Sequence, residues 1–132
     1  MKNILFDSHA ILKFYQDEDG ADQVEKLLIS SRQGDLKAFM SEINLGEVYY
    51  MTIRRLGLAS AKEYLEQFSE LLIQVVPATS DIICSACEIK AEYAISYADC
   101  FAAATALKVD ASIITGDPEF RKVDHLVRID WI

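Results

Sequence analysis

Short apolar runs alternate along the chain with longer amphipathic segments. The apolar runs end at turn residues or acids, and their length is typical of β-strands. They are KNILF, LKAFM, IQVVPAT, ASIITGD and the closing LVRIDWI. The amphipathic segments place apolar residues three and four positions apart, which predicts helices. They are SHAILKFYQDEDG, ADQVEKLLISSRQG, SEINLGEVYYMTIRRLG, ASAKEYLEQFSELL, SDIICSACEIKAEYAI and SYADCFAAATALKVD, and PEF adds one further turn.

This order of elements predicts an α/β fold. A strand that is followed by helices and then by another strand favours a mostly parallel, five-stranded sheet with helices on both faces. The 132 residues fit a single domain that spans residues 1–132. Ligands bind such sheets at the carboxyl ends of the strands, so Asp7 and Asp117, which each end a strand, are expected at one edge.

Composition narrows the class of protein. Hydrophobic residues make up 52% of the chain, which is enough for a packed core. The apolar runs are too short to cross a bilayer and MKNILFDSHA lacks a cleavage signature, so a cytoplasmic protein is expected. The chain has three cysteines, and this odd number argues against a disulfide framework. CSAC lies inside an amphipathic helix and lacks a fourth zinc ligand, so Cys84 and Cys87 are expected to be buried, small and apolar.

The charge balance is acidic. Thirteen Lys and Arg residues stand against 21 Asp and Glu residues, which gives a net charge of −8. A chain of this charge does not coat nucleic acid by electrostatics alone. A role on nucleic acid therefore requires local basic patches, or cations held by the acids. Substrate choice would depend on basic side chains, namely Arg54, Arg55, Lys62, Arg121 and Lys122.

Three of the acids have a structural explanation when each is taken alone. Asp7 follows a strand and precedes a helix, which is a typical N-cap position. Asp117 precedes a proline and so marks a helix start. Asp99 lies three residues after Ser96, as in a capping box. The small residues that follow Asp99 let its helix approach the sheet closely, so its carboxylate also has a route to the sheet edge.

Glu47 is the acid that capping does not explain. It lies inside a helix, on one face with Ile43, Tyr50 and Arg54. A glutamate among apolar neighbours is seldom buried unless it is paired or binds a metal. An ion pair with Arg54 is the alternative to a functional role. Gly46 weakens the helix beside Glu47, which indicates close packing at that point.

Together the acids indicate a metal site. Two acids end strands of one sheet, and the other two lie on helices that can pack over the same edge. Carboxylates in one pocket repel each other, and a hard divalent cation such as Mg²⁺ or Mn²⁺ removes that conflict. Such a cation acidifies water and neutralises a leaving oxygen. The pattern therefore points to metal-assisted hydrolysis of phosphodiesters.

The segments ILFDSHAIL, INLGEVYY, ISYADCFAAATAL and IITGDPEF resemble, in order and spacing, the acidic motifs of PIN-domain ribonucleases. The size of the chain is similar to that of VapC-type toxins of toxin–antitoxin pairs. The resemblance implies a catalytic metal site of four acids, with the first and third as the likeliest direct ligands and with two hydroxyl side chains in support. The acids are Asp7, Glu47, Asp99 and Asp117, and the supporting residues are Thr115 and Ser8.

The resemblance also implies partners: an RNA substrate, a small antitoxin and a second copy of the chain in a homodimer. An acidic pocket would attract an Arg- or Lys-bearing antitoxin peptide that displaces the metal. Tyr49, Tyr50 and Tyr64 would supply the apolar part of its groove. One departure is His9, where many members carry a small polar residue. No partner for it is identifiable, so a packing role or a solvent-facing imidazole is expected.

Three other functions fit the sequence less well. A Mg²⁺-binding, phosphoryl-accepting signalling domain requires adjacent acids after the first strand and a lysine at the end of the last one. An aspartyl-nucleophile phosphatase requires a second aspartate at the position of His9. Ser8 and His9 follow Asp7 instead. A catalytically inert PIN-like binding module has no motivation while all four acids are present.

Overall fold

The computed structural model describes residues 1–132, and its centre is a five-stranded sheet. The strand order is β3-β2-β1-β4-β5 and every neighbouring pair is parallel, so the predicted α/β fold is confirmed. The strands are β1 (Lys2–Phe6), β2 (Leu36–Ser41), β3 (Gln74–Val76), β4 (Ser112–Thr115) and β5 (Ile129–Trp131). Four of them fall within a predicted apolar run, and β2 extends one residue past its run, to Ser41.

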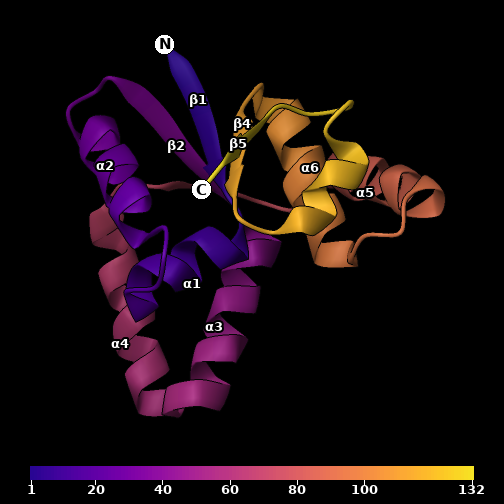
Figure 1. Cartoon of the computed structure of the whole chain (residues 1–132). Helices are drawn as coiled ribbons and strands as arrows, with labels where there is room; N and C mark the ends of the chain where they lie inside the picture. The colour runs from indigo at the N-terminus through magenta and orange to yellow at the C-terminus, as the bar shows by residue number, and fades with distance from the viewer.

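Helices connect the strands, and each predicted amphipathic segment forms one (Figure 1). They are α1 (Ser8–Gln16), α2 (Ala21–Arg32), α3 (Glu42–Leu56), α4 (Leu58–Phe68), α5 (Ser80–Glu92) and α6 (Tyr97–Val109). Two details differ from the prediction. The end of the fourth segment is a separate 3₁₀ turn, η1 (Ser69–Leu71), and the single turn predicted at PEF is a longer 3₁₀ helix, η2 (Pro118–Val123).

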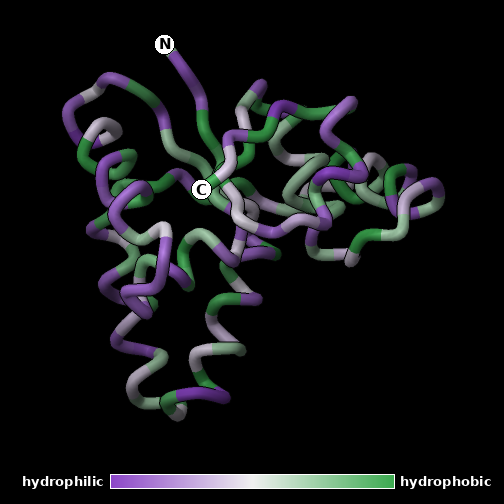
Figure 2. The backbone as a smooth tube through the Cα atoms, viewed as in Figure 1, coloured by the Kyte–Doolittle hydropathy of each residue, from purple (hydrophilic) through white to green (hydrophobic).

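The two faces of the sheet bury different helices. Ile4, Phe6 and Ile114 face one core with residues of α1 and α2, whereas Leu5 and Ile113 face a second core with α5 and α6. The chain is hydrophilic at its N-terminus and becomes hydrophobic where β1 enters the molecule (Figure 2). α6 packs closely against the sheet because its inner residues are small, as predicted. These buried residues are Ala102, Ala103, Ala104 and Ala106.

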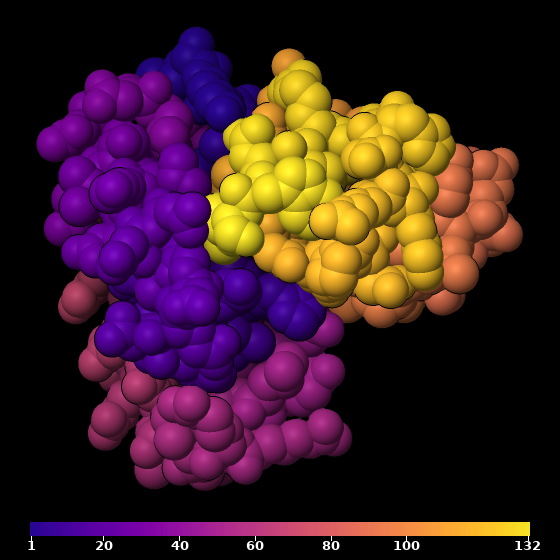
Figure 3. Space-filling model, in the orientation of Figure 1, coloured from indigo at the N-terminus to yellow at the C-terminus, as the bar shows by residue number.

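The C-terminus of the chain packs beside its first two helices. The C-terminal residues lie against the N-terminal segment that carries α1 and α2 (Figure 3). Ile132 is partly buried against the core that includes Ile11 and Val24. Its main-chain N–H donates to the carbonyl oxygen of Thr115 at 3.0 Å, which continues the pairing of β5 with β4 past Trp131. This pairing holds the carboxyl end of β5 beside that of β4.

Two packing expectations are wrong. Cys84 and Cys87 are exposed on α5, and only Cys100 is buried. The inner positions of α5 belong to Ile82, Ala86 and Ile89, so the cysteines occupy the outer face of the helix. Gly46 is exposed as well, and a Cβ built there would meet nothing within 4 Å. No helix of the protein combines the length and the apolar character needed to cross a membrane.

Candidate active site

Asp7 lies at the carboxyl end of β1 and is fully buried. It is the N-cap of α1, and its Oδ1 accepts a hydrogen bond from the backbone N–H of Ala10 at 2.8 Å. Its Oδ2 accepts a second one from the hydroxyl of Thr115, at 2.5 Å. The N-cap role is therefore real. It fixes the orientation of the carboxylate and still leaves lone pairs on both oxygens for another ligand.

Asp117 lies at the same edge, just beyond β4. Its backbone N–H donates to the hydroxyl of Thr115 at 3.0 Å, so the Thr115 side chain links the two strand-end aspartates. The Asp117 carboxylate caps η2 by accepting from the N–H of Glu119 at 3.0 Å. The prediction that Asp7 and Asp117 meet at one edge is confirmed, and Thr115 joins them. Ser8 is buried at the start of α1, and no hydrogen bond joins its hydroxyl to the acids.

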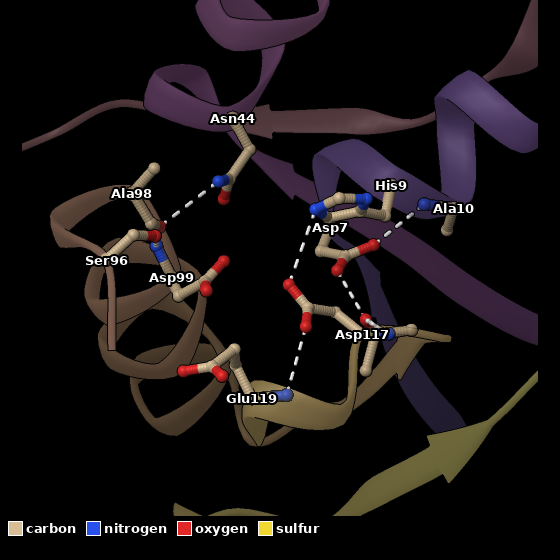
Figure 4. Close-up of polar contacts among 10 residues, drawn as sticks. Asp7, His9, Ala10, Asn44, Ser96, Ala98, Asp99, Asp117 and Glu119 are labelled. Carbon is tan, nitrogen blue, oxygen red and sulfur yellow. Dashed lines mark hydrogen bonds and ion pairs between the residues drawn. The ribbon is translucent and has the colours of Figure 1, made fainter. Parts of the chain in front are cut away.

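Asp99 lies in the first turn of α6, but it is not the cap of that helix. Ser96 is the N-cap, and its hydroxyl accepts a hydrogen bond from the backbone N–H of Asp99 at 3.1 Å. The reciprocal bond of a capping box, from the Ser96 N–H to the Asp99 carboxylate, is not formed. The Asp99 side chain extends toward the same space as that of Asp117 (Figure 4). Its carboxylate is therefore available to a ligand.

The acids share one electrostatic neighbourhood. Burial raises the pKa of Asp7 to about 6, and the charge of Asp99 adds to the increase. The hydrogen bonds from Thr115 and Ala10 lower the pKa, but by less than burial raises it. Burial also raises the pKa of Asp99 to about 6, and the charges of Asp117 and Glu47 raise it further. Carboxylates that raise one another's pKa feel each other's charge, and a positive charge placed between them would relieve that repulsion.

Glu47 belongs to this group through α3. Its Oε1 is buried and has no hydrogen-bond partner. The alternative ion pair with Arg54 is not formed, because the guanidinium of Arg54 lies over the ring of Tyr50, 5.3 Å from its centroid. A buried carboxylate oxygen without a partner is costly, and a bound cation would remove that cost.

Asn44 is a site residue that the sequence analysis missed. It is fully buried one helical turn before Glu47, and its Nδ2 donates to the carbonyl oxygen of Ala98 at 3.1 Å. This bond ties α3 to α6 directly beside Asp99. The Oδ1 of Asn44 is buried without a partner, as is the Oε1 of Glu47. The available signal was an amide side chain within an apolar helical segment, on the same face as the glutamate.

His9 has a partner after all. Its imidazole is about half exposed, and Nε2 lies 3.3 Å from Oδ2 of Asp117. The half-exposed ring agrees with the expected solvent-facing imidazole. The contact with Asp117 is an addition to that expectation, because the first turn of α1 carries His9 toward η2 (Figure 4). Sequence spacing does not show this approach, since 108 positions separate the two residues along the chain.

The sequence matches the PIN-domain family over residues 4–126. The chain is a PIN domain. Comparison of the sequence with curated proteins finds no match.

Solved structures of toxin–antitoxin complexes have the same fold as this PIN domain. DNA-bound VapBC from Salmonella typhimurium is similar with a TM-score of 0.78 at 17% identity, over 99% of this chain and 98% of that one. VapBC2 from Rickettsia felis, bound to a DNA fragment from its promoter, gives a TM-score of 0.75 at 14% identity over 98% of both chains. The structure of VapC20 from Mycobacterium tuberculosis, a sarcin–ricin loop cleaving toxin, gives a TM-score of 0.67 at 18% identity, over 83% of this chain and 86% of that one.

The donor set of this PIN domain fits a hard divalent cation. Every candidate ligand is an oxygen, the carboxylates raise one another's pKa, and the buried oxygens of Glu47 and Asn44 have no partner. As the side chains stand, no three of the acids converge tightly enough to form a coordination sphere. Binding of a cation would therefore draw them together around the space that α1, α3, α6 and η2 enclose (Figure 4).

Proposed function

We propose that this PIN domain is a metal-dependent endoribonuclease that hydrolyses RNA phosphodiester bonds with Mg²⁺ or Mn²⁺. The observation that carries the proposal is that carboxylates from four separate elements, with Asp7 and Asp99 buried, repel one another at the carboxyl edge of the sheet. No cationic side chain neutralises Glu47 or Asp99 in this arrangement, so a metal ion is the natural counter-charge. The family match and the toxin folds that resemble this chain support the assignment.

The proposed roles follow from how each side chain is held. Asp7 and Asp99 are the direct ligands, and Glu47 and Asp117 complete the negative charge around the cation. Thr115 positions Asp7 through the hydrogen bond to Oδ2 and supports the backbone of Asp117. When bound, the cation supplies acidified water and stabilises the leaving oxygen. The backbone N–H groups of the capped helices keep the carboxylates oriented before any substrate arrives.

We further propose that the chain is the toxin of a cytoplasmic VapBC-type module, a homodimer held by a small antitoxin. The apolar surface for such a partner would come from α1, α3 and α4, where Tyr15, Tyr49 and Tyr64 line a pocket with room for about one water molecule. A peptide side chain would bind there only if these rings moved apart. The hydroxyl of Tyr15 is buried there without a partner. Tyr50, expected in the same groove, is not among the lining residues. A cationic antitoxin side chain would enter the acidic site and compete with the metal.

The experiment uses the chain freed from any bound partner. Structured RNA is expected to be cleaved in Mg²⁺ or Mn²⁺, to stay intact in EDTA, and to be cleaved again when Mn²⁺ is restored. Cleavage that continues in EDTA would overturn the metal mechanism. Chain isolated from its host before this step is expected to carry a small protein whose removal releases the activity. A lone, fully active monomer would contradict the antitoxin and the homodimer.

A further inference from the structure

Two arginine–aromatic pairs lie on the surface of the molecule. The guanidinium of Arg121 lies over the ring of Trp131, 5.8 Å from its centroid, and that of Arg54 lies over the ring of Tyr50 at 5.3 Å. Both rings are open to solvent, with 44% of Trp131 and 46% of Tyr50 exposed. Exposed aromatic rings of this size are not needed to fill the core. The guanidinium over each ring places positive charge at these two points of a chain whose net charge is −8.

The first pair stands at the edge of the sheet that holds the acids. Trp131 ends β5 in direct register with Thr115 of β4, and Thr115 donates to Asp7. Residues in register on parallel strands project to the same face of the sheet, so Trp131 shares a face with Thr115 and Asp7. Arg121 follows Asp117 by four residues within η2. The Arg121–Trp131 pair therefore borders the acidic site on the η2 side.

The second pair stands on the α3 side. Glu47, Tyr50 and Arg54 occupy positions i, i+3 and i+7 of α3, which form one stripe along a helix. With a rise of about 1.5 Å per residue, Arg54 lies about 10 Å farther along the helix axis than Glu47. α3 and η2 border the acidic site on opposite sides (Figure 4). The two pairs thus flank the site.

The chemistry of these pairs suits unpaired nucleotides. Bases stack on aromatic rings and on arginine planes, and a guanidinium also contacts the neighbouring phosphate. A base inside a duplex is covered by its neighbours and cannot use such a platform. The other cation of η2 is already engaged, since Lys122 contacts Glu119 and the carbonyl oxygen of Ala94. Arg121 and Arg54 have only their rings beneath them and remain open to a phosphate.

We propose that the Arg121–Trp131 and Arg54–Tyr50 pairs are nucleotide-docking platforms on either side of the scissile phosphate. They position single-stranded RNA over the acidic site and discriminate against duplex RNA. This inference rests on the proposed function, because it takes the substrate of the site to be RNA. The four residues are positioning residues, and none of them contacts the carboxylates.

The test uses the only tryptophan of the chain as its probe. A mixed-sequence RNA of about ten nucleotides is mixed rapidly with the protein in Mg²⁺ buffer, so that the signal precedes cleavage. Stacking on Trp131 is expected to quench its fluorescence, whereas the same strand annealed to its complement leaves the emission unchanged. Trp131→Ala, Arg121→Ala and Tyr50→Ala are expected to raise KM for cleavage by about 5- to 100-fold with little change in kcat.

Trp131→Phe keeps an aromatic ring and is expected to restore most of the affinity, which a purely structural role of the indole would not predict. Arg128→Ala is the matched control for lost charge, because Arg128 contacts Asp110 and Ser112 at the opposite end of β4. The platform proposal would be overturned if the duplex bound as tightly as the single strand, or if single-stranded RNA did not quench Trp131. It would also be overturned if the folded variants cleaved RNA with an unchanged KM. If quenching occurs but RNA is never cleaved, the platforms stand and the nuclease proposal fails.

Discussion

Asp7 combines two functions that the sequence presents as alternatives. As N-cap of α1 it accepts from Ala10, and as a buried carboxylate beside Thr115 it faces the space shared with Asp99. Both hydrogen bonds stabilise the charged form, yet burial dominates and raises the pKa of Asp7 to about 6. The residue is held in place by the helix that it starts, so capping supplies the orientation that the proposed role as a metal ligand needs.

Substitution of Asp99 distinguishes a helix-capping role from a metal-ligand role. Because Ser96 caps α6 through the backbone of Asp99, Asp99→Asn leaves the cap intact and removes one repelling charge. We expect RNA cleavage to fall by more than about 100-fold. Loss of a residue that only supports a metal ligand lowers metal affinity by about 10- to 100-fold, and loss of a direct ligand should lower Mn²⁺ affinity at least as much. The melting temperature without metal is expected to stay equal or rise. Cleavage assays, calorimetric Mn²⁺ titration and thermal melts measure these three quantities.

Asp22→Asn is the matched control, since Asp22 is an exposed acid in the first turn of α2. It is expected to leave cleavage and Mn²⁺ affinity unchanged. If Asp99→Asn bound Mn²⁺ as tightly as the wild type and melted at a lower temperature, Asp99 would be a structural residue. The site would then consist of Asp7, Glu47 and Asp117.

At the scale of elements, the packing of α6 places Asp99, a proposed metal ligand, near the strand ends. Its inner face is alanine, so its backbone comes close enough to the sheet for Asp99 to reach the strand ends. Asn44 then joins α3 to the first turn of α6 through the carbonyl oxygen of Ala98. Glu47 and Asp99 are thereby fixed relative to each other by a bond that neither of them makes.

Ala103→Leu tests the close approach of α6. Ala103 is fully buried in the core that also contains Leu5 and Ile113. Adding three carbons there forces α6 away from the sheet and is expected to lower the free energy of unfolding by about 1–3 kcal/mol. Urea denaturation measures this change. Leu107→Ala, at a half-exposed position of the same helix, is the control and is expected to lower the free energy of unfolding much less. If Ala103→Leu were as stable as the wild type, the packing argument would be wrong.

Periodicity was sufficient to predict these elements, because strand and helix periods differ and the turn residues separate them. The convergence of Asp7 and Asp117 followed from the parallel topology alone. The same reasoning missed Asn44 and the contact of His9 with Asp117, which depend on how two helices and a 3₁₀ turn pack. It also placed Cys84 and Cys87 inside, since residue type suggested burial while the inner positions of α5 were filled by isoleucine and alanine.

At the scale of the whole molecule, the net negative charge is expected to repel the proposed substrate. The chain carries a net charge of −8 and concentrates buried acids at one edge, although its proposed substrate is a polyanion. A bound cation and the two arginine–aromatic pairs would reverse the sign of the potential only where the scissile phosphate lies. Elsewhere the acidic surface opposes nonspecific binding. On this account the metal controls substrate access as well as chemistry.

The same balance predicts the pH dependence of stability. Asp7 and Asp99 have pKa values of about 6 in the folded chain, above the ordinary value of 3.8. Between these values the folded state binds more protons than the unfolded state, so the metal-free protein loses stability as pH rises through 6. Its melting temperature is expected to be higher at pH 5 than at pH 7.5. Asp81, whose pKa is lowered to about 2, acts in the opposite direction but only below this window.

Mn²⁺ is expected to reverse this dependence, because the cation binds the carboxylates only when they have lost their protons. Thermal melts across pH 5 to 7.5, with Mn²⁺ and with EDTA, measure both effects. Added Mn²⁺ should raise the melting temperature strongly at pH 7.5 and little at pH 5. Asp99→Asn should flatten both profiles, whereas Asp22→Asn, which removes one negative charge equally, should not. A metal-free protein that becomes steadily more stable from pH 5 to 7.5 would show that groups of the protein already stabilise the ionised carboxylates without a metal ion.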